Sequence, residues 1–172
     1  MHLRFALPAL AALLAACTSY GPGALPKGSS VAAVTQAMGS PTGEHALPSG
    51  GRRLEFARGP FGRQTYMLDF DAAGQLVGSQ QVLTEANFNA IQPGMSAAQV
   101  LALIGRPAKT WGISRQKQIV WSYRYDSTPF CQWFMVGMGY DDVVVDTAYG
   151  PDPLCDDDDF SIFGRGIFRI GR

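Results

Sequence analysis

The stretch that decides the fold reads "GMSAAQVLALIGRP" and runs from Gly94 to Pro107. Ser96 and Gln99 have the spacing of a capping box, in which each side chain bonds a backbone N–H at the start of a helix. Four residues then follow the i, i+3, i+4, i+7 periodicity of one apolar helix face: Ala97, Val100, Leu101 and Ile104. Gly105 can end the helix in the left-handed conformation, and Pro107 prevents its continuation. No lysine follows the second glycine, so the glycines predict helix ends and not a phosphate-binding loop.

The same pattern occurs earlier as "GSSVAAVTQAMGSP", at Gly28 to Pro41. Identical residues recur 66 positions apart, at Gly28/Gly94, Ser30/Ser96, Ala32/Ala98, Val34/Val100, Gly39/Gly105 and Pro41/Pro107. Each shared residue belongs to the start, the apolar face or the end of the helix. The recurrence indicates a duplicated structural unit.

Three runs of strand-like sequence follow each predicted helix. They are 52–58, 63–70 and 75–83 in the first half, and 118–125, 130–140 and 143–149 in the second. Leu54 and Phe56 correspond to Trp121 and Tyr123, at a spacing of 67. Residues 84–91 join the halves and predict a further short helix. We therefore expect an α+β fold of two tandem repeats, each with one or two short helices packed on a three-stranded antiparallel meander.

The helix motif and the strand after it carry a resemblance to a known family. The matching residues are Gly94, Met95, Ser96, Gln99, Val100, Gly105, Pro107, Trp121 and Tyr123. Together they resemble the SmpA/OmlA (BamE-like) outer-membrane lipoproteins, well over residues 84–149 and more weakly over 28–83. The tandem arrangement also resembles the β-lactamase inhibitory protein, whose halves form a concave sheet that binds a partner. The second unit, an extra cysteine pair and a C-terminal extension depart from the family pattern. The resemblance thus implies a lipoprotein of that fold family, and not the assembly-complex subunit itself.

The N-terminus, "MHLRFALPALAALLAAC", has the layout of an export signal. Its apolar run, Phe5 to Ala16, is shorter than the roughly 20 residues that span a bilayer. Leu14 to Cys17 matches the bacterial lipobox, which predicts a signal peptide at 1–16 and lipidation of Cys17. The alternative is an ordinary signal peptide that contains a cysteine. Residues 17–27 are rich in Gly and Pro and predict a tether.

Lipidation would decide where the protein resides. Lipoproteins that this chain resembles carry two or three acyl chains, which anchor a protein stably. Thr18 follows the cysteine, where an aspartate commonly retains such proteins at the inner membrane. We therefore expect an outer-membrane, periplasm-facing protein whose acylated Cys17 contacts the lipid.

Two cysteines remain in the mature chain besides Cys17. In an oxidising periplasm the pair Cys131 and Cys155 predicts a disulfide. A metal site is the alternative, but it lacks further ligands: His45, the other candidate, is distant in sequence and predicted to lie in an exposed loop. The expected domains are a first repeat at 28–83, a second at 84–155 and a tail at 156–172.

The C-terminal part of the chain is charged in two blocks. From Asp126 to Asp159 there are nine aspartates and no basic residue, whereas 160–172 holds three arginines and no acid. The acidic run lacks the ligand spacing of a calcium loop, so a solvated acidic edge is favoured over a calcium site. The tail could add a strand, lie on an anionic membrane or remain without structure.

No catalytic, cofactor or metal constellation occurs in the sequence, and a net charge of zero favours no nucleic-acid partner. Trp121, Tyr123 and Tyr125 alternate on one predicted strand, with Trp133 on the next. Packing in the core is the favoured role of these aromatics, and binding of a protein partner is the alternative. The leading hypothesis is a non-enzymatic outer-membrane lipoprotein that serves as a protein-binding scaffold in envelope assembly or maintenance. The alternative is a periplasmic inhibitor-like or ligand-binding module.

Overall fold

A computed structural model describes residues 21–23, 25–126 and 131–153. The first half holds α1 (Val31–Met38), β1 (Gly43–Ala46), β2 (Arg52–Ala57), the 3₁₀ helix η2 (Gly59–Phe61), β3 (Thr65–Phe70) and β4 (Leu76–Gln81). The second half holds α2 (Glu85–Asn89), α3 (Ala97–Ile104), β5 (Lys109–Ile113), the 3₁₀ helix η3 (Ser114–Gln116), β6 (Gln118–Asp126), β7 (Cys131–Gly139) and β8 (Val144–Pro151). The chain thus forms two α+β units in tandem, as the sequence predicts.

Each unit has a four-stranded antiparallel sheet, in the order β1-β2-β3-β4 and β5-β6-β7-β8. The prediction of three-stranded meanders was therefore wrong by one strand in each unit. The missed strands, "GEHA" and "KTWGI", are short edge strands that contain glycine, which weakens the local signal for a strand. They form because β2 and β6 offer them a free edge to pair with.

The predicted helix ends are present in both units. Ser96 and Gln99 form the capping box of α3, and Ser30 caps α1 through the amide of Ala33. Gly39 and Gly105 end the two helices with φ of 84° and 78°. Their ψ values, −173° and −166°, lie outside the left-handed helical region that the sequence predicts. Both conformations still have positive φ, which glycine adopts at the lowest cost.

The duplication extends to contacts that the sequence does not reveal. In each unit, the backbone amide of the glycine that precedes the helix donates to the carbonyl of the first residue of the last strand. Gly28 donates to Leu76 of β4 at 2.8 Å, and Gly94 donates to Val144 of β8 at 2.9 Å. The last strand pair of each sheet also changes register at one place, after Asp69 in the first unit and after Gly137 in the second. The two units are therefore copies in register as well as in topology.

Each unit has its own apolar core. In the first, α1 packs on one sheet face, through Val34, Met38, Leu54, Phe56, Leu68, Phe70 and Leu76. In the second, α2 and α3 pack on the corresponding face, through Leu83, Phe88, Ile91, Val100, Ile104, Tyr123, Tyr125, Phe134, Val136, Met138 and Val144. Phe88 stacks on Phe134 with the ring centroids 4.3 Å apart. Each sheet thus keeps a second face for other contacts.

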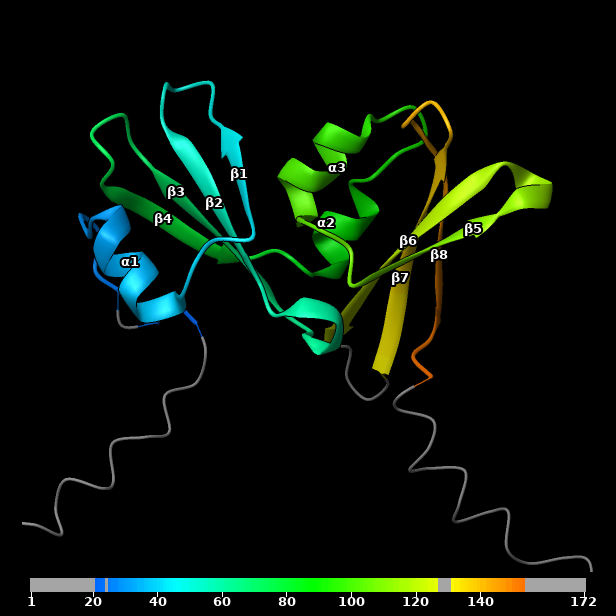
Figure 1. Cartoon of the computed structure of the whole chain (residues 1–172), viewed down its shortest axis with the longest axis horizontal. Helices are drawn as coiled ribbons and strands as arrows, with labels where there is room; N and C mark the ends of the chain where they lie inside the picture. Colours follow the sequence, from blue (N-terminus) through cyan, green and yellow to red (C-terminus); the bar gives the residue numbers. More distant parts are fainter. Residues whose placement is uncertain (1–20, 24, 127–130, 154–172) are drawn as a thin grey trace, which may run out of the picture.

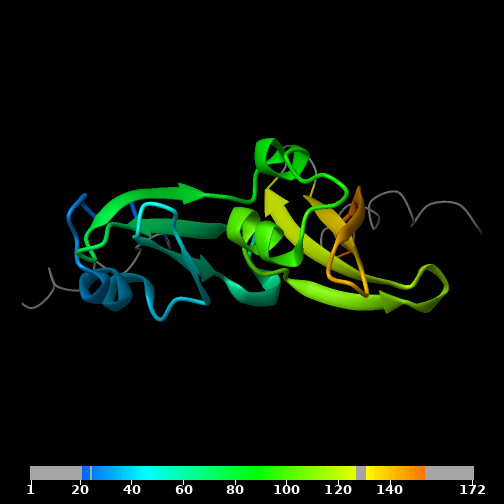
Figure 2. The same cartoon turned by 90° about the horizontal axis from the view of Figure 1, so that it is seen from above.

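The two units differ in what lies on that second face. Figure 1 shows α2 and α3 between the two sheets, and Figure 2 shows the units end to end along the long axis. The second face of the first sheet contacts α3, because Arg53 of β2 reaches the carbonyl of Ala102. Within the described ranges, no α-helix lies on the second face of the second sheet.

Candidate functional site

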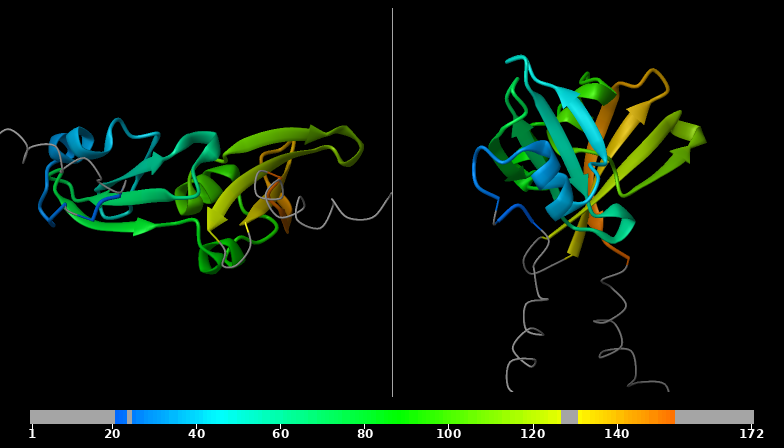
Figure 3. Two further views of the ribbon diagram at one scale, coloured as in Figure 1. Left: turned by 90° about the horizontal axis from the view of Figure 1, so that it is seen from below. Right: turned by 60° about the vertical axis from the view of Figure 1, so that its left-hand side comes forward.

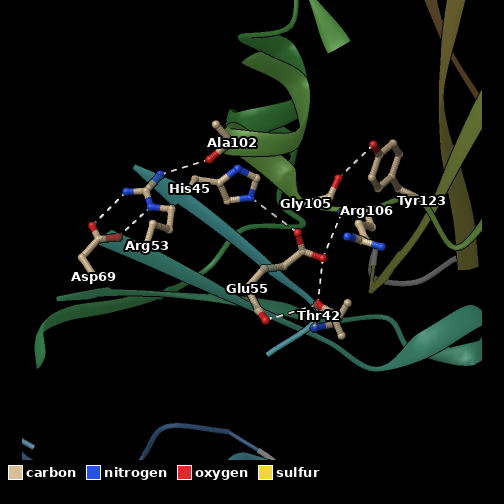
Figure 4. A network of polar contacts seen from close by, with 10 residues as sticks. Thr42, His45, Arg53, Glu55, Asp69, Ala102, Gly105, Arg106 and Tyr123 are labelled. Atoms are coloured by element: carbon tan, nitrogen blue, oxygen red, sulfur yellow. Dashed lines mark hydrogen bonds and ion pairs between the residues drawn. The ribbon is translucent and has the colours of Figure 1, made fainter. Parts of the chain in front are cut away.

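The junction between the units is built around Glu55, a fully buried residue of β2. Its Oε1 accepts hydrogen bonds from the hydroxyl of Thr42 at 2.9 Å and from the backbone amide of Arg106 at 3.1 Å. Arg106 follows α3, so one carboxyl group joins the first sheet to the end of the second unit's helix (Figure 4). The fit is close: a Cβ on Gly105 would lie 3.0 Å from Cδ of Glu55.

Arg53 makes the second polar link across the junction. Its Nε and Nη2 donate to the carboxylate of Asp69 at 2.6 and 2.9 Å, and its Nη1 donates to the carbonyl of Ala102 at 3.1 Å. The hydrogen bond to Asp69 is the main cause of a raised pKa of Arg53, and burial opposes it. A cation near the carboxyl end of α3 also complements the helix dipole.

His45 does not lie in an exposed loop, so that prediction was wrong. It belongs to β1, pairs with Arg53 on β2, and is 20% exposed. Its Nε2 lies 3.6 Å from Oε2 of Glu55, an ion-pair distance when the imidazole is protonated. The sequence does not indicate a strand at "GEHA", because this short run lies between turn-like segments. Pairing of β1 with β2 places the imidazole of His45 next to Glu55.

A pocket of about 320 Å³ opens beside this junction. Both units line it: Thr42, Ala57, Arg58, Gly59, Pro60, Gly62, Thr65 and Leu83 come before α3, and Arg106, Pro107, Ala108, Tyr123 and Arg124 after it. Three of these residues are arginines, and the set contains no acidic residue. We refer to it below as the junction pocket.

Arg124, which lines the junction pocket, is held by contacts on several sides. Its side chain is 10% exposed, and its Nε lies 3.2 Å from a carboxylate oxygen of the buried Asp152. Its guanidinium lies 5.3 Å from the ring centre of Trp133 and 5.7 Å from that of Phe61. Phe61 comes from η2 of the first unit, which reaches the second sheet in both views of Figure 3. These contacts fix Arg124 in place.

The second face of the second sheet carries large side chains that no described α-helix covers. The strand registers place Trp111, Ile113, Val120, Arg124, Trp133 and Met135 on this side. Trp111 and Trp133 lie with their ring centroids 5.7 Å apart, and Nζ of Lys109 lies 5.9 Å from the ring of Trp111. Trp111, Ile113 and Met135 are partly exposed. We call this surface the tryptophan face.

The four aromatics singled out in the sequence lie on opposite sides of this sheet. Tyr123 and Tyr125 are buried in the core beneath α2 and α3, and Trp121 packs against that core. Trp133 is on the other side, paired with Arg124. Placement of the two tyrosines in the core agrees with the favoured interpretation.

Tyr123 and Tyr149, both on the helix side of the second sheet, have raised pKa values. Burial, and then the charge of Glu55, raises the pKa of Tyr123 well above its usual value. The Tyr123 hydroxyl donates to the carbonyl of Gly105 at 3.1 Å. Burial, and then Glu85, raises the pKa of Tyr149. These shifts reflect packing, since the two hydroxyls donate to the carbonyl of Gly105 and to the side-chain amide oxygen of Asn89, and neither acceptor is a base for proton transfer.

Several predicted sites lie outside the described residues. These are the signal peptide, the lipidation site Cys17, Cys155, the acidic run at 156–159 and the tail at 160–172. The side chain of Cys131 is not described either, so the disulfide stays a prediction. Within the described ranges, no group of three His, Cys, Asp or Glu side chains could hold a metal ion. No helix of these ranges is long and apolar enough to cross a membrane.

This chain has little similarity to known proteins. No family model matches the chain, and no curated protein matches it. A solved structure of the "putative beta-lactamase inhibitor protein" of Streptococcus mutans is 9% identical, covers 77% of this chain and 88% of its own, and has a TM-score of 0.30. A DUF4309 family protein (YjgB) from Bacillus subtilis is 16% identical, with coverages of 72% and 79% and a TM-score of 0.25. At these values neither structure assigns a function to this chain.

Proposed function

We propose that this protein is a non-enzymatic outer-membrane lipoprotein that binds another envelope protein through the tryptophan face. It faces the periplasm, is anchored by acylated Cys17, and acts in envelope assembly or maintenance. The observation that carries the proposal is the partly exposed Trp111, which lies beside the buried Trp133 on a sheet face that no described α-helix covers.

The chemistry of the tryptophan face fits a protein partner. Tryptophan and arginine dominate the binding energy of protein interfaces, and Met is enriched in them. Here Arg124 and Trp133 are already held by neighbours, so little side-chain entropy is lost when a partner binds. Trp111, Ile113 and Met135 supply the exposed apolar surface beside them.

The sequence supports the location. The lipobox at Leu14 to Cys17 favours lipid attachment, and Thr18 and the resemblance to SmpA/OmlA lipoproteins favour the outer membrane. Replacing Cys17 by Ser should leave a protein without the added lipid mass, recovered in the soluble periplasmic fraction. Intact-mass spectrometry and membrane fractionation measure this outcome, and continued membrane attachment of the variant would contradict the anchor.

Site-specific photo-crosslinking tests the binding face. A photo-reactive amino acid at position 111 should crosslink an outer-membrane protein in intact cells, because the partner covers this residue. The matched control is position 140, since Tyr140 is 64% exposed but lies in the turn after β7. Trp111→Ala should abolish the crosslink from a reactive group placed at position 113.

The alternative function gives a different outcome in the same experiment. An inhibitor-like or ligand-binding module would crosslink a soluble periplasmic enzyme, or nothing of protein size, at position 111. Equal crosslinking at positions 111 and 140 would exclude the tryptophan face as a specific site. Recovery of a soluble enzyme alone would replace the scaffold with the inhibitor-like function.

A further inference from the structure

Beyond protein binding, we infer that the junction pocket is a binding site for a small organic anion. The ligand class is a carboxylate or a phosphate monoester on a compact apolar body. The pocket shares Arg124 with the tryptophan face, but the partly exposed Trp111, Ile113 and Met135 do not line it. Neither the family resemblance nor the scaffold function requires the pocket.

The charge of the lining favours an anion. Arg58, Arg106 and Arg124 line the pocket without any acidic residue. The carboxylate of Asp152, the partner of Arg124, is buried and is not part of the lining. The structure gives the exposed side chain of Arg106 no ion pair within the described ranges. An anion in the pocket would therefore meet arginines from both units, although Arg124 is already paired with Asp152 and the carboxylate of Glu55 lies behind the lining residues Thr42 and Arg106.

Contacts fix the side chain of Arg124 and the backbone, but not the side chain, of Arg106. The backbone amide of Arg106 is held by the carboxyl group of Glu55, directly after the end of α3. Arg124 lies between Phe61 and Trp133 and beside Asp152. Such preorganisation reduces the entropy lost on binding. A surface arginine without these contacts would be a weaker site.

The size and the apolar walls restrict the ligand. A volume of about 320 Å³ is at the small end of ligand sites, which span roughly 300–1,000 Å³. Pro60, Leu83, Pro107 and Ala108 contribute apolar surface. An anion that also carries a compact apolar group buries this surface, whereas inorganic phosphate does not. The pocket should thus prefer an organic anion to a free inorganic one.

Titration of the folded protein with three probes tests the inference. Phenyl phosphate should bind saturably, inorganic phosphate more weakly, and the neutral benzyl alcohol without saturation. Amide chemical shifts measured by NMR should change at Arg58, Thr65 and Arg106, which report on the pocket. Raising the salt concentration should weaken the binding of phenyl phosphate, because ions screen the arginines.

A pair of arginine variants makes the test specific. Arg106→Gln should raise the dissociation constant for phenyl phosphate about tenfold or more, as expected for the loss of one charge-assisted contact. The backbone amide that bonds Glu55 is retained in this variant. Arg115→Gln is the control, because Arg115 is exposed on η3 and outside the pocket. Should Arg106→Gln fail to fold, Arg58→Gln serves the same purpose.

The inference is overturned by the absence of saturable binding of phenyl phosphate, by equal binding of benzyl alcohol, or by equal dissociation constants for the pocket variant and Arg115→Gln. Inorganic phosphate binding as tightly as phenyl phosphate would also overturn it, because the site would then recognise free phosphate and not an organic anion.

Discussion

The two sheets have the same topology and the same register, yet their second faces are used differently. On the first sheet, the face away from α1 carries Arg53, Glu55 and Asp69 and contacts α3. On the second, the corresponding register positions are Val120, Ser122 and Gly137. No described α-helix covers that face.

This comparison separates the features that both copies of the unit share from the sheet face that differs between them. Both copies need a glycine at the helix end, a bonded loop before the helix and a register change in the last hairpin. Neither needs a particular second face. One copy has a polar face that holds the next unit, and the other has tryptophans and an arginine that we assign to an external partner.

The largest expected effect comes from breaking the junction at Glu55. Glu55→Ala leaves the amide of Arg106 without its acceptor and removes the nearer of two acceptors of the Thr42 hydroxyl in a part-buried site. We expect a loss of about 3 kcal/mol in unfolding free energy. The two units should then unfold at different urea concentrations, because a main link between their cores is removed.

The chain offers two probes for this separation. All three tryptophans (Trp111, Trp121 and Trp133) lie in the second unit, so their fluorescence reports on that unit, whereas circular dichroism reports on both. The control is Glu44→Ala on the neighbouring strand, where a half-exposed ion pair with Arg52 contributes at most about 1 kcal/mol. Coincident transitions in Glu55→Ala with an unchanged midpoint would contradict the role of the junction.

A smaller effect should distinguish the two helix ends. Gly39→Ala and Gly105→Ala both place a side chain at positive φ, at a cost of about 1–3 kcal/mol each. Only at Gly105 does the new Cβ meet neighbours at 3.0 Å, on Glu55 and on Thr65; at Gly39 nothing lies within 4 Å. Gly105→Ala should therefore be more destabilising by about 1 kcal/mol or more. Equal losses in urea unfolding would mean that α3 is not tightly packed on the first sheet.

The smallest effect concerns Tyr123, whose counterpart in the first unit is Phe56. Tyr123→Phe removes the hydrogen bond to Gly105 and should cost about 1 kcal/mol at neutral pH. Above about pH 10 the unfolded tyrosine ionises, while the folded one, with its raised pKa, keeps its proton. The folded state then binds more protons, so wild-type stability falls as pH rises. This fall should be shallower in the variant, as measured by urea unfolding at pH 7 to 11; identical slopes would contradict it.

The repeated helices and six of the eight strands could be predicted, because their signals are local. Ser96 and Gln99 have the spacing of a cap, and Leu54 and Phe56 alternate with charged residues as strand residues do. The edge strands β1 and β5 were missed because their pairing depends on the neighbouring strand and not on their own composition. The sequence predicts the positive φ of Gly105, but its ψ depends on the direction that the chain takes after the helix.

The junction could not be predicted from the sequence. Arg53, Glu55 and Asp69 alternate with apolar residues, which is the pattern of a strand with one face in water. That face is instead contacted by a helix about fifty residues later in the chain. A carboxyl group buried in this way gives no local signal, and neither does the pocket beside it, which needs both units.

The difference at Val120, Ser122 and Gly137 also limits how many units can stack. In a duplicated chain whose first sheet binds the helix of the next unit, an equivalent second sheet could bind α1 of another molecule. Such contacts are head-to-tail and do not close, so they lead to fibres. The second sheet lacks the arginine, the glutamate and the aspartate that hold α3 on the first. The second sheet therefore does not offer a helix of another molecule the polar contacts that α3 receives from the first sheet.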